Sequence, residues 1–252
     1  MKLFKKISLL ILRKLGMVRG EINQNDRHGA LFKSWGHVYT NSLVGDYVEF
    51  GVYQGDSVVS SLDSLKKFNS WFMSQYHSNE AWRRDHAKKS ALNNPRMFHC
   101  LDTFEGMPDN NEGAISFAPG NFICDLNTVK TKVNKANSDG IEIQYYKGLF
   151  CDTKAEFQSS MQNRKIAIAN IDCDLQESAA DALSCIEQNI DIGTVVLFDD
   201  YNCFNADNNK GQRKAFSDFR NKSSFVFEKF FTYHFAGQAF LVVGNNKADL
   251  KN

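Results

Sequence analysis

The stretch that decides the fold begins with KIAIANIDCDL (165–175) and ends with GTVVLFDDY (193–201). It contains two short apolar runs rich in Ile and Val, Ile166–Ile171 and Thr194–Phe198, as expected of buried strands in a parallel sheet. Between them, Gln176–Ile190 has apolar residues at helical spacing. Strand, helix, strand predicts a βαβ unit with parallel strands, and open α/β sheets bind ligands at the carboxyl ends of such strands.

Each of the two predicted strands is followed by a pair of aspartates. Asp172 and Asp174 follow the first strand, and Asp199 and Asp200 follow the second. Two like charges about 4 Å apart repel by roughly 4 kcal/mol at an effective dielectric constant of about 20, which favours a cation among them. Carboxylate oxygens suit Mg²⁺, Mn²⁺ or Ca²⁺. One such Asp would only end a strand, but pairs on consecutive strands predict a divalent metal site.

The composition fits a single large α/β domain. A chain of 252 residues can bury a substantial core, and its formal net charge of +1 gives no sign of nucleic-acid binding. The six cysteines lack C-x-x-C spacing, which favours reduced thiols in a cytoplasmic protein over a disulfide framework or a zinc site.

The first sixteen residues, MKLFKKISLLILRKLG, mix basic and apolar side chains. They are too few for a transmembrane helix, and no small-residue cleavage site follows. A basic amphipathic helix can lie on the inner face of a membrane, or it can pack on the domain or on a second subunit, and both alternatives stay open. We expect residues 1–40 to form this helix and a covering segment, and residues 41–252 to form the main domain, with an insertion at 69–96.

A glycine turn in EFGVYQGDS (49–57) follows another predicted strand. Strand, glycine turn and helix are how α/β proteins seat a nucleotide-bearing cofactor. Gly51 and Gly55 form G-x-x-x-G and not the dinucleotide fingerprint G-x-G-x-x-G. Glu49, at the end of the strand, suits a cationic group such as the amine of S-adenosylmethionine (SAM) and is poorly suited to a pyrophosphate.

The next predicted strand, Met97–Leu101, ends at Asp102, whose carboxylate can accept hydrogen bonds from both hydroxyls of a ribose. The long loop that follows includes residues 105–122, and we expect these residues to act as a lid. A third strand is predicted at Ile141–Tyr146. The runs Phe225–Phe230 and Ala239–Val243 predict an antiparallel hairpin that closes the sheet.

Five motifs in this order resemble a known family. EFGVYQGDS (49–57) resembles the first motif of class I SAM-dependent methyltransferases, and more closely that of the catechol-type, metal-dependent O-methyltransferases. The others resemble the macrocin O-methyltransferase (TylF-type) family, whose members methylate sugar hydroxyls on antibiotics and similar glycosides. These are DTFEGMP (102–108), Asp172-Cys-Asp174, Asp199-Asp200-Tyr201 and GQRKAFSDFR (211–220). The similarity covers roughly residues 40–245.

The resemblance implies a Rossmann-like, seven-stranded, mostly parallel sheet with an antiparallel last strand and helices on both faces. It implies a SAM- and divalent-metal-dependent O-methyltransferase that acts on a hydroxyl of a glycoside, or of a lipid- or nucleotide-linked saccharide. A homo-oligomer is compatible with it. The cofactor would be held by Glu49, Gly51, Tyr53, Gly55, Ser57, Asp102, Gly148, Phe150, Cys151 and Asp172.

The resemblance also implies roles for the aspartates. Asp172, Asp199 and Asp200 would bind Mg²⁺ or another divalent cation such as Mn²⁺, and Asp174 would be the general base. Which of Asp172 and Asp174 is ligand and which is base stays open, and His234 in the closing hairpin is another conceivable base.

A metal-dependent glycosyltransferase is the alternative, because many sugar-nucleotide enzymes hold Mn²⁺ with Asp-x-Asp after a hydrophobic strand. This alternative explains neither Glu49-x-Gly51 nor the second pair at Asp199 and Asp200.

Overall fold

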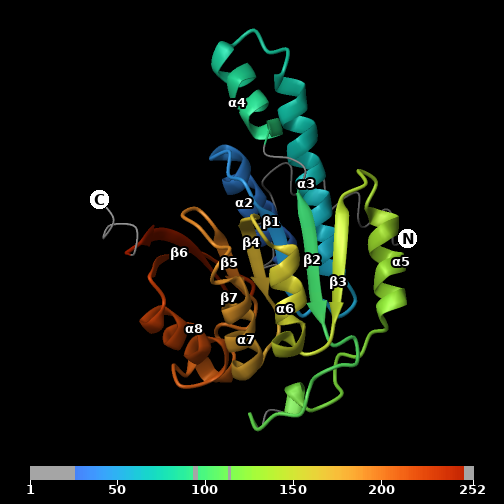
Figure 1. Ribbon diagram of the computed structural model, residues 1–252, viewed down its shortest axis with the longest axis vertical. Coiled ribbons are helices and arrows are strands. Elements are labelled where there is room, and N and C mark those ends of the chain that lie inside the picture. Colours follow the sequence, from blue (N-terminus) through green and yellow to red (C-terminus); the bar gives the residue numbers. More distant parts are fainter. Residues whose placement is uncertain (1–25, 93–95, 113–114, 247–252) are drawn as a thin grey trace, which may run out of the picture.

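The computed structural model describes residues 26–92, 96–112 and 115–246 (Figure 1). They form a seven-stranded sheet with helices on both faces. The amphipathic helix predicted at residues 1–16 lies outside the described residues. Within the described ranges, no helix has the length and apolar character needed to cross a bilayer.

The sheet has the strand order β3-β2-β1-β4-β5-β7-β6. Strands β1 to β5 run parallel, and β7 is antiparallel to both of its neighbours, which confirms the predicted sheet and its closing hairpin. The order changes direction between β1 and β4, and α/β sheets bind ligands at such a switch point. The strands are β1 (Asp46–Phe50), β2 (Met97–Asp102), β3 (Glu142–Lys147), β4 (Ile166–Ile171), β5 (Val195–Phe198), β6 (Phe225–Tyr233) and β7 (Gly237–Asn245).

Two apolar cores lie on opposite faces of the sheet. On β1, Tyr47 contributes to the core under α2 and α3, whereas Val48 and Phe50 contribute to the core under α6, α7 and α8. Strand β1 is buried along its whole length because both faces are covered. The helices are α2 (Arg27–Thr40), α3 (Asp56–Gln75), α4 (Ala81–Leu92), α5 (Leu126–Ala136), α6 (Phe150–Ser160), α7 (Gln176–Ile186) and α8 (Gly211–Lys222).

Helix α2 is fixed to the sheet by Trp35. The Trp35 ring stacks on Phe98 of β2 with a centroid distance of 6.1 Å, and its Nε1 donates a hydrogen bond of 2.8 Å to Ser61 of α3. Trp35 is fully buried, and aromatic packing of this kind contributes about 0.5–1.5 kcal/mol beyond the buried area. The first turn of α2, which carries Arg27, is therefore held at a defined position above the carboxyl ends of β4 and β5.

The insertion predicted at 69–96 contains the end of α3 and all of α4, which packs against α3. The end of α3 and helix α4 project beyond the sheet at the end opposite the carboxyl ends of β2 and β3 (Figure 1).

Candidate active site

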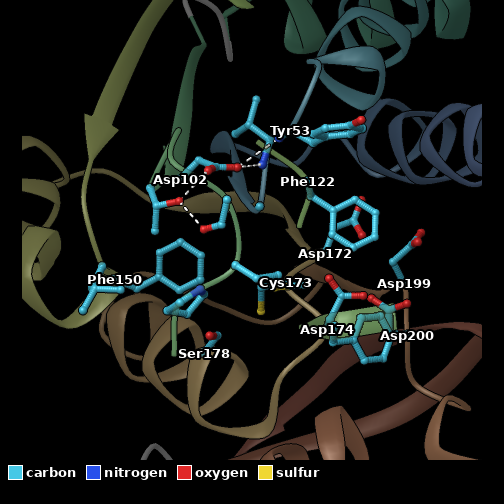
Figure 2. A pocket seen from close by; sticks show the side chains of 18 of the residues that line it. Tyr53, Asp102, Phe122, Phe150, Asp172, Cys173, Asp174, Ser178, Asp199 and Asp200 are labelled. Carbon is cyan, nitrogen blue, oxygen red and sulfur yellow. Dashed lines mark hydrogen bonds between the residues drawn. The ribbon is translucent and has the colours of Figure 1, made fainter. Parts of the chain in front are cut away.

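A cavity of about 490 Å³ opens at the carboxyl ends of the central strands (Figure 2). Its volume is that of a typical small-molecule or cofactor site. Its walls come from the glycine turn after β1, the loop after β2, the first turns of α6 and α7, and the acidic ends of β4 and β5. The predicted site residues that line it are Gly51, Tyr53, Ser57, Asp102, Phe150, Cys151, Asp172, Asp174, Asp199 and Asp200.

The glycine turn brings the ends of β1 and β4 into backbone contact. Gly51 has a φ of +86°, and a Cβ added there would stand 1.8 Å from the carbonyl oxygen of Asp172. The Asp172 amide in turn donates a 2.8 Å hydrogen bond to the Phe50 carbonyl. Only glycine fits this position, because it tolerates positive φ and carries no side chain.

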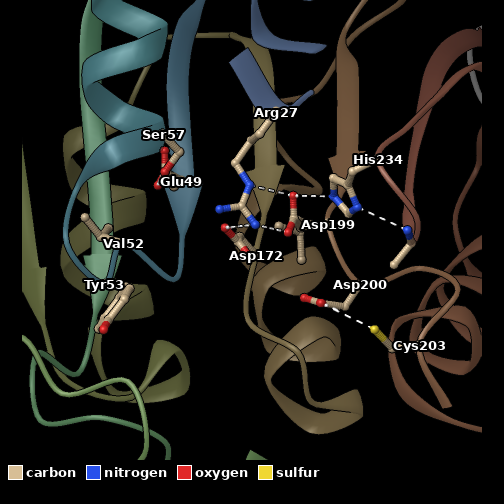
Figure 3. A network of polar contacts seen from close by, with 12 residues as sticks. Arg27, Glu49, Val52, Tyr53, Ser57, Asp172, Asp199, Asp200, Cys203 and His234 are labelled. Atoms are coloured by element: carbon tan, nitrogen blue, oxygen red, sulfur yellow. Dashed lines mark hydrogen bonds and ion pairs between the residues drawn. The ribbon is translucent and has the colours of Figure 1, made fainter. Parts of the chain in front are cut away.

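Glu49 lies behind the cavity wall and not in it. It is fully buried, and its two carboxyl oxygens accept hydrogen bonds from the hydroxyls of Ser57 and Tyr47. Figure 3 shows Glu49 next to Ser57. Burial raises the pKa of Glu49 to about 7, although the two hydroxyls pull the pKa down. Ser57, which does line the cavity, connects Glu49 to it. The predicted contact of Glu49 with the SAM amine therefore remains a prediction, and Ser57 is the nearer group.

Asp102 ties the two cofactor-side turns together. Its Oδ2 accepts from the backbone amides of Val52 and Tyr53, at 2.6 and 2.9 Å, and its Oδ1 accepts from the amide of Phe104 at 2.7 Å. These bonds fix the carboxylate at the cavity wall. The two amides fill both lone pairs of Oδ2, so the capacity left for a ligand hydroxyl lies on Oδ1.

The far end of the cavity is formed by the turn after β3. The amide of Gly148 donates to the carbonyl of Asp102 at 3.0 Å, which closes this turn against β2. Leu149, Phe150 and Cys151 then reach the cavity, and the Phe150 ring packs edge-on against Phe50 at 5.1 Å. Gly148 shapes this wall, as Gly55 shapes the turn after β1, without lining the cavity itself.

The loop predicted to act as a lid folds along one side of the cavity. Its base is fixed by two backbone hydrogen bonds, from Met107 to the Asn121 carbonyl and from Gly120 to the Met107 carbonyl, at 2.8 and 2.9 Å. Phe122 lies edge-on to Tyr53 with a centroid distance of 5.6 Å (Figure 2). This aromatic pair forms part of the cavity wall at the glycine turn.

Three aspartates meet where β4 and β5 end. Oxygen atoms of Asp172, Asp199 and Asp200 all lie within 4.8 Å of one another. The parallel pairing of Ile171 with Phe198 places the next residue of each strand side by side. Buried Gln212 fixes this edge further, because its side chain accepts from the Asp200 amide at 3.0 Å and donates to the Ile171 carbonyl at 3.2 Å.

The electrostatics of this cluster are unbalanced. Burial, followed by the charge of Asp199, raises the pKa of Asp172 well above its usual range. Burial and the neighbouring Asp174 do the same to the pKa of Asp200. Burial alone would raise the pKa of Asp199, but hydrogen bonds from His234 and Arg27 hold it below its ordinary value. The cluster therefore favours either protons or an added cation.

Asp174 borders the cluster and lines the cavity. It has a φ of +56°, a left-handed conformation that is uncommon for a residue with a side chain. Burial and the charge of Asp172 raise the pKa of Asp174 to about 7. A carboxyl with a pKa near neutrality suits a general base.

His234 faces Asp199. Its Nδ1 accepts from the Ala236 amide at 3.1 Å, so we infer that Nε2 carries the proton and donates to Asp199 Oδ1 at 3.0 Å (Figure 3). This arrangement orients a carboxylate, and it gives His234 no free nitrogen toward the cavity.

Arg27 also reaches the cluster. Its Nε donates to Asp199 Oδ1 at 2.8 Å, its Nη2 donates to Asp199 Oδ2, and Nη2 lies 3.5 Å from Asp172 Oδ2 (Figure 3). No sequence motif predicts this contact, because 172 positions separate Arg27 from Asp199.

The sequence reasoning also missed the wall that α7 contributes. Glu177, Ser178 and Asp181 line the cavity from the first two turns of this helix. The signal was present, since the helix follows directly after Asp172-Cys-Asp174, and the amino end of a helix after a parallel strand faces the same edge of the sheet.

Comparisons with known proteins agree with this architecture. The profile of the family described as Macrocin-O-methyltransferase (TylF) matches residues 86–228. No curated protein sequence is significantly similar to the chain. Among solved structures, the chain is similar to the O-methyltransferase NovP, with 17% sequence identity and a TM-score of 0.62, covering 87% of this chain and 80% of that one.

A second similar structure is CalS11, described as a calicheamicin methyltransferase. It has 18% identity and a TM-score of 0.61, covering 86% of this chain and 79% of that one. An apo structure of CalS11, described as a TDP-rhamnose 3'-O-methyltransferase, has 17% identity and a TM-score of 0.55, with the same coverage. At these identities the likeness shows the fold alone.

The family match, together with the strand order, rules out the alternative of a glycosyltransferase. The Asp172-Cys-Asp174 motif therefore follows the fourth strand of a class I methyltransferase sheet. The chain belongs to the macrocin O-methyltransferase (TylF) family and is a SAM-dependent O-methyltransferase.

Proposed function

We propose that this enzyme transfers the methyl group of SAM to a hydroxyl of a sugar and that the transfer depends on a divalent cation. The observation that carries the proposal is the joining of two sets of residues in one cavity. The glycine turn and Asp102 form one end, and the three clustered aspartates form the other. Methyl transfer needs the nucleoside cofactor and a metal-held hydroxyl side by side, which a cavity with these two ends allows.

The cofactor end fits SAM by its shape and by its donor groups. Gly51 keeps the backbone of the turn free of side-chain bulk, and Asp102 presents Oδ1 of a fixed carboxylate to a ribose hydroxyl. Ser57 and Tyr53 lie at the methionine end, and the turn at Gly148–Cys151 lies at the adenine end. When bound, SAM supplies an activated methyl group. The protein contributes alignment and the exclusion of water, which are worth several kcal/mol in reactions of this kind.

The acidic end fits a divalent cation. Asp200 Oδ2 is buried, and no residue of the described ranges gives it a hydrogen bond, which is costly for a carboxylate unless something else neutralises it. The donor set, three carboxylates, suits Mg²⁺ or Mn²⁺. When bound, the cation lowers the pKa of a hydroxyl placed next to it.

Asp174 is the residue that we assign to proton removal. It lines the cavity beside Asp200, and its pKa of about 7 lets its carboxylate accept a proton near neutral pH. Asp172 then acts as a ligand, because its oxygen lies within the cluster that includes Asp199 and Asp200.

A sugar acceptor is supported by the relatives. The family takes its description from macrocin O-methylation, and CalS11 is described as acting on TDP-rhamnose. The cavity wall offers further carboxylates, from Asp109, Glu177 and Asp181, that can accept hydrogen bonds from several sugar hydroxyls.

The remaining segments complete the proposal. We expect residues 1–40 and the loop 105–122 to cover the acceptor, and residues 41–252 to form the catalytic domain with its insertion at 69–96; residues 1–25 lie outside the described part of the chain. Contact of residues 1–16 with a membrane, or with a second subunit, stays a prediction that liposome co-sedimentation with and without these residues would test.

A methyl-transfer assay with labelled SAM tests the function. Glycosides, nucleotide-linked sugars and lipid-linked sugars are offered in parallel, each with EDTA or with MnCl₂. We expect an O-methylated sugar that forms only with the cation. Full turnover in EDTA would refute the metal dependence, and transfer confined to acceptors without a sugar would refute the sugar assignment.

A further inference from the structure

Arg27 occupies the acidic cluster in the way that a cation would. Its guanidinium makes a forked contact with Asp199 and lies 3.5 Å from the nearest oxygen of Asp172 (Figure 3). It thus bridges two of the three proposed metal ligands. Among the described residues that line the cavity, Arg27 alone carries a cationic side chain.

This contact uses carboxylate oxygens of two of the three proposed ligands. Asp199 Oδ1 accepts from both Arg27 and His234, which fills its two lone pairs, and Oδ2 accepts from Arg27. A cation shared by Asp199 Oδ2 and Asp172 Oδ2 would lie between these two atoms. Arg27 Nη2, which contacts both oxygens, is in the same place. The guanidinium and the cation therefore exclude each other.

The structure contains a second fork of the same kind that serves only the fold. At the start of β1, buried Asp46 accepts from Arg164 Nε and Nη2, at 2.5 and 2.8 Å, and lies 3.4 Å from His99 Nε2. The pKa of Asp46 is lowered below its ordinary value, because hydrogen bonds from Arg164 and His99 outweigh its burial. Arg164 therefore offers a matched comparison for Arg27.

We propose that Arg27 is an exchangeable counter-ion of the acidic cluster: it neutralises Asp172 and Asp199 in the metal-free enzyme and leaves them when a divalent cation binds. This inference rests on the metal site proposed above. The side chain has a solvent-exposed side toward which it can swing, because it is 39% exposed and extends from the first turn of α2 to the cavity. Arg27 and the cation therefore compete for the same carboxylates.

Competition between Arg27 and a cation predicts opposite effects on cation affinity and on the stability of the metal-free protein. Removing Arg27 should strengthen cation binding and, at the same time, destabilise the metal-free protein. We expect Arg27→Met to bind Mn²⁺ about tenfold more tightly than wild type, the usual worth of one hydrogen bond to a charged group. We expect its Tm in EDTA to fall below that of wild type, because Asp199 loses its partner. Arg27→Lys keeps the charge without the fork and should lie between the two.

The experiment measures Mn²⁺ binding by calorimetry and Tm in EDTA for wild type, Arg27→Met, Arg27→Lys and Arg164→Lys. Arg164→Lys breaks the matched fork at Asp46 and should lower Tm while leaving the Mn²⁺ Kd within about twofold of wild type. The two lysine variants carry the same chemical change. A difference between their Mn²⁺ Kd values is therefore caused by the position of Arg27 at the acidic cluster.

The outcomes separate this inference from the proposed function. Tighter Mn²⁺ binding by Arg27→Met supports exchange, and so does binding by Arg27→Met where wild type binds none. Binding by both proteins with equal affinity, or weaker binding by Arg27→Met, overturns exchange and leaves the metal site standing. Absence of Mn²⁺ binding in both proteins overturns the metal site, and exchange with it.

Discussion

Gly51 and Asp172 are in such close backbone contact that a Cβ at position 51 would stand 1.8 Å from the Asp172 carbonyl oxygen. The turn that faces the cofactor and the strand end that carries a proposed metal ligand are therefore held as one unit. A side chain at position 51 would have to push them apart, so it should disturb both ends of the cavity together.

We predict that Gly51→Ala weakens binding of both S-adenosylhomocysteine and Mn²⁺ and lowers Tm. The positive φ alone costs on the order of 1–3 kcal/mol, and the overlap with Asp172 adds to it. Calorimetry and thermal unfolding check this. The matched control is Gly140→Ala, where φ is +66° and a Cβ meets nothing within 4 Å. Equal loss of stability in the two variants would show that strain, and not the contact with Asp172, decides the outcome.

Much of this fold could be predicted from the sequence because its signals are local. Strands β4 and β5 are short apolar runs, each of the five parallel strands ends in or is followed by glycine or aspartate, and the order of strands along the chain implies which ends share an edge. Ile166–Ile171 is both predicted and observed, and Asp172 and Asp199 do meet. Residues that are close in the sequence stay close in the structure, so a short motif predicts the relative positions of its own side chains.

What could not be predicted depends on contacts between distant segments. The depth of Glu49 is set by Tyr47 and Ser57, which close over its carboxyl group, and no periodicity reveals that closure. Arg27 reaches Asp199 only because Trp35 fixes α2 on the sheet. Side-chain partners of this kind follow from packing, which sequence patterns do not encode.

We predict that Asp199→Ala and Asp102→Ala separate the two ligands. Asp199→Ala should reduce Mn²⁺ binding by about a hundredfold or more and leave S-adenosylhomocysteine binding nearly unchanged, because it removes an oxygen of the cluster only. Asp102→Ala should weaken S-adenosylhomocysteine binding and leave Mn²⁺ binding nearly unchanged, since it removes the carboxylate on the cofactor side. Titration of each variant with each ligand checks both halves. Loss of Mn²⁺ binding in Asp102→Ala with retention in Asp199→Ala would mean that the two ends are exchanged.

We predict that Asp174→Asn lowers kcat by roughly 10²–10⁴, the usual contribution of a positioned base, with little change in Mn²⁺ affinity. The carboxamide keeps the shape of the side chain and cannot take up a proton. In wild type, kcat should rise with pH as this carboxyl ionises, and this limb should be absent from the variant. The limb should lie below the metal-free pKa of about 7, because a bound cation favours the ionised carboxylate. A variant that keeps the limb would assign the base to another group.

We predict that the metal-free enzyme loses stability as pH rises from about 4 to about 7. Burial raises the pKa of Asp174 from 3.8 to about 7, so within this window the folded state holds a proton that the unfolded state has released. The stabilisation that the proton on Asp174 gives the folded state is complete below pH 4 and is lost as pH rises through 7. Each unit of pKa shift corresponds to about 1.4 kcal/mol of this stabilisation. Urea unfolding in EDTA at pH 5 and pH 8 measures the change in the free energy of unfolding, and Asp174→Asn should reduce that change.

Adding MnCl₂ should reverse the trend, because a cation bound by carboxylates stabilises the folded state more as they ionise. An unchanged pH dependence in Asp174→Asn would place the titrating proton on Asp172, Asp200 or Glu49, whose pKa values burial raises in the same direction.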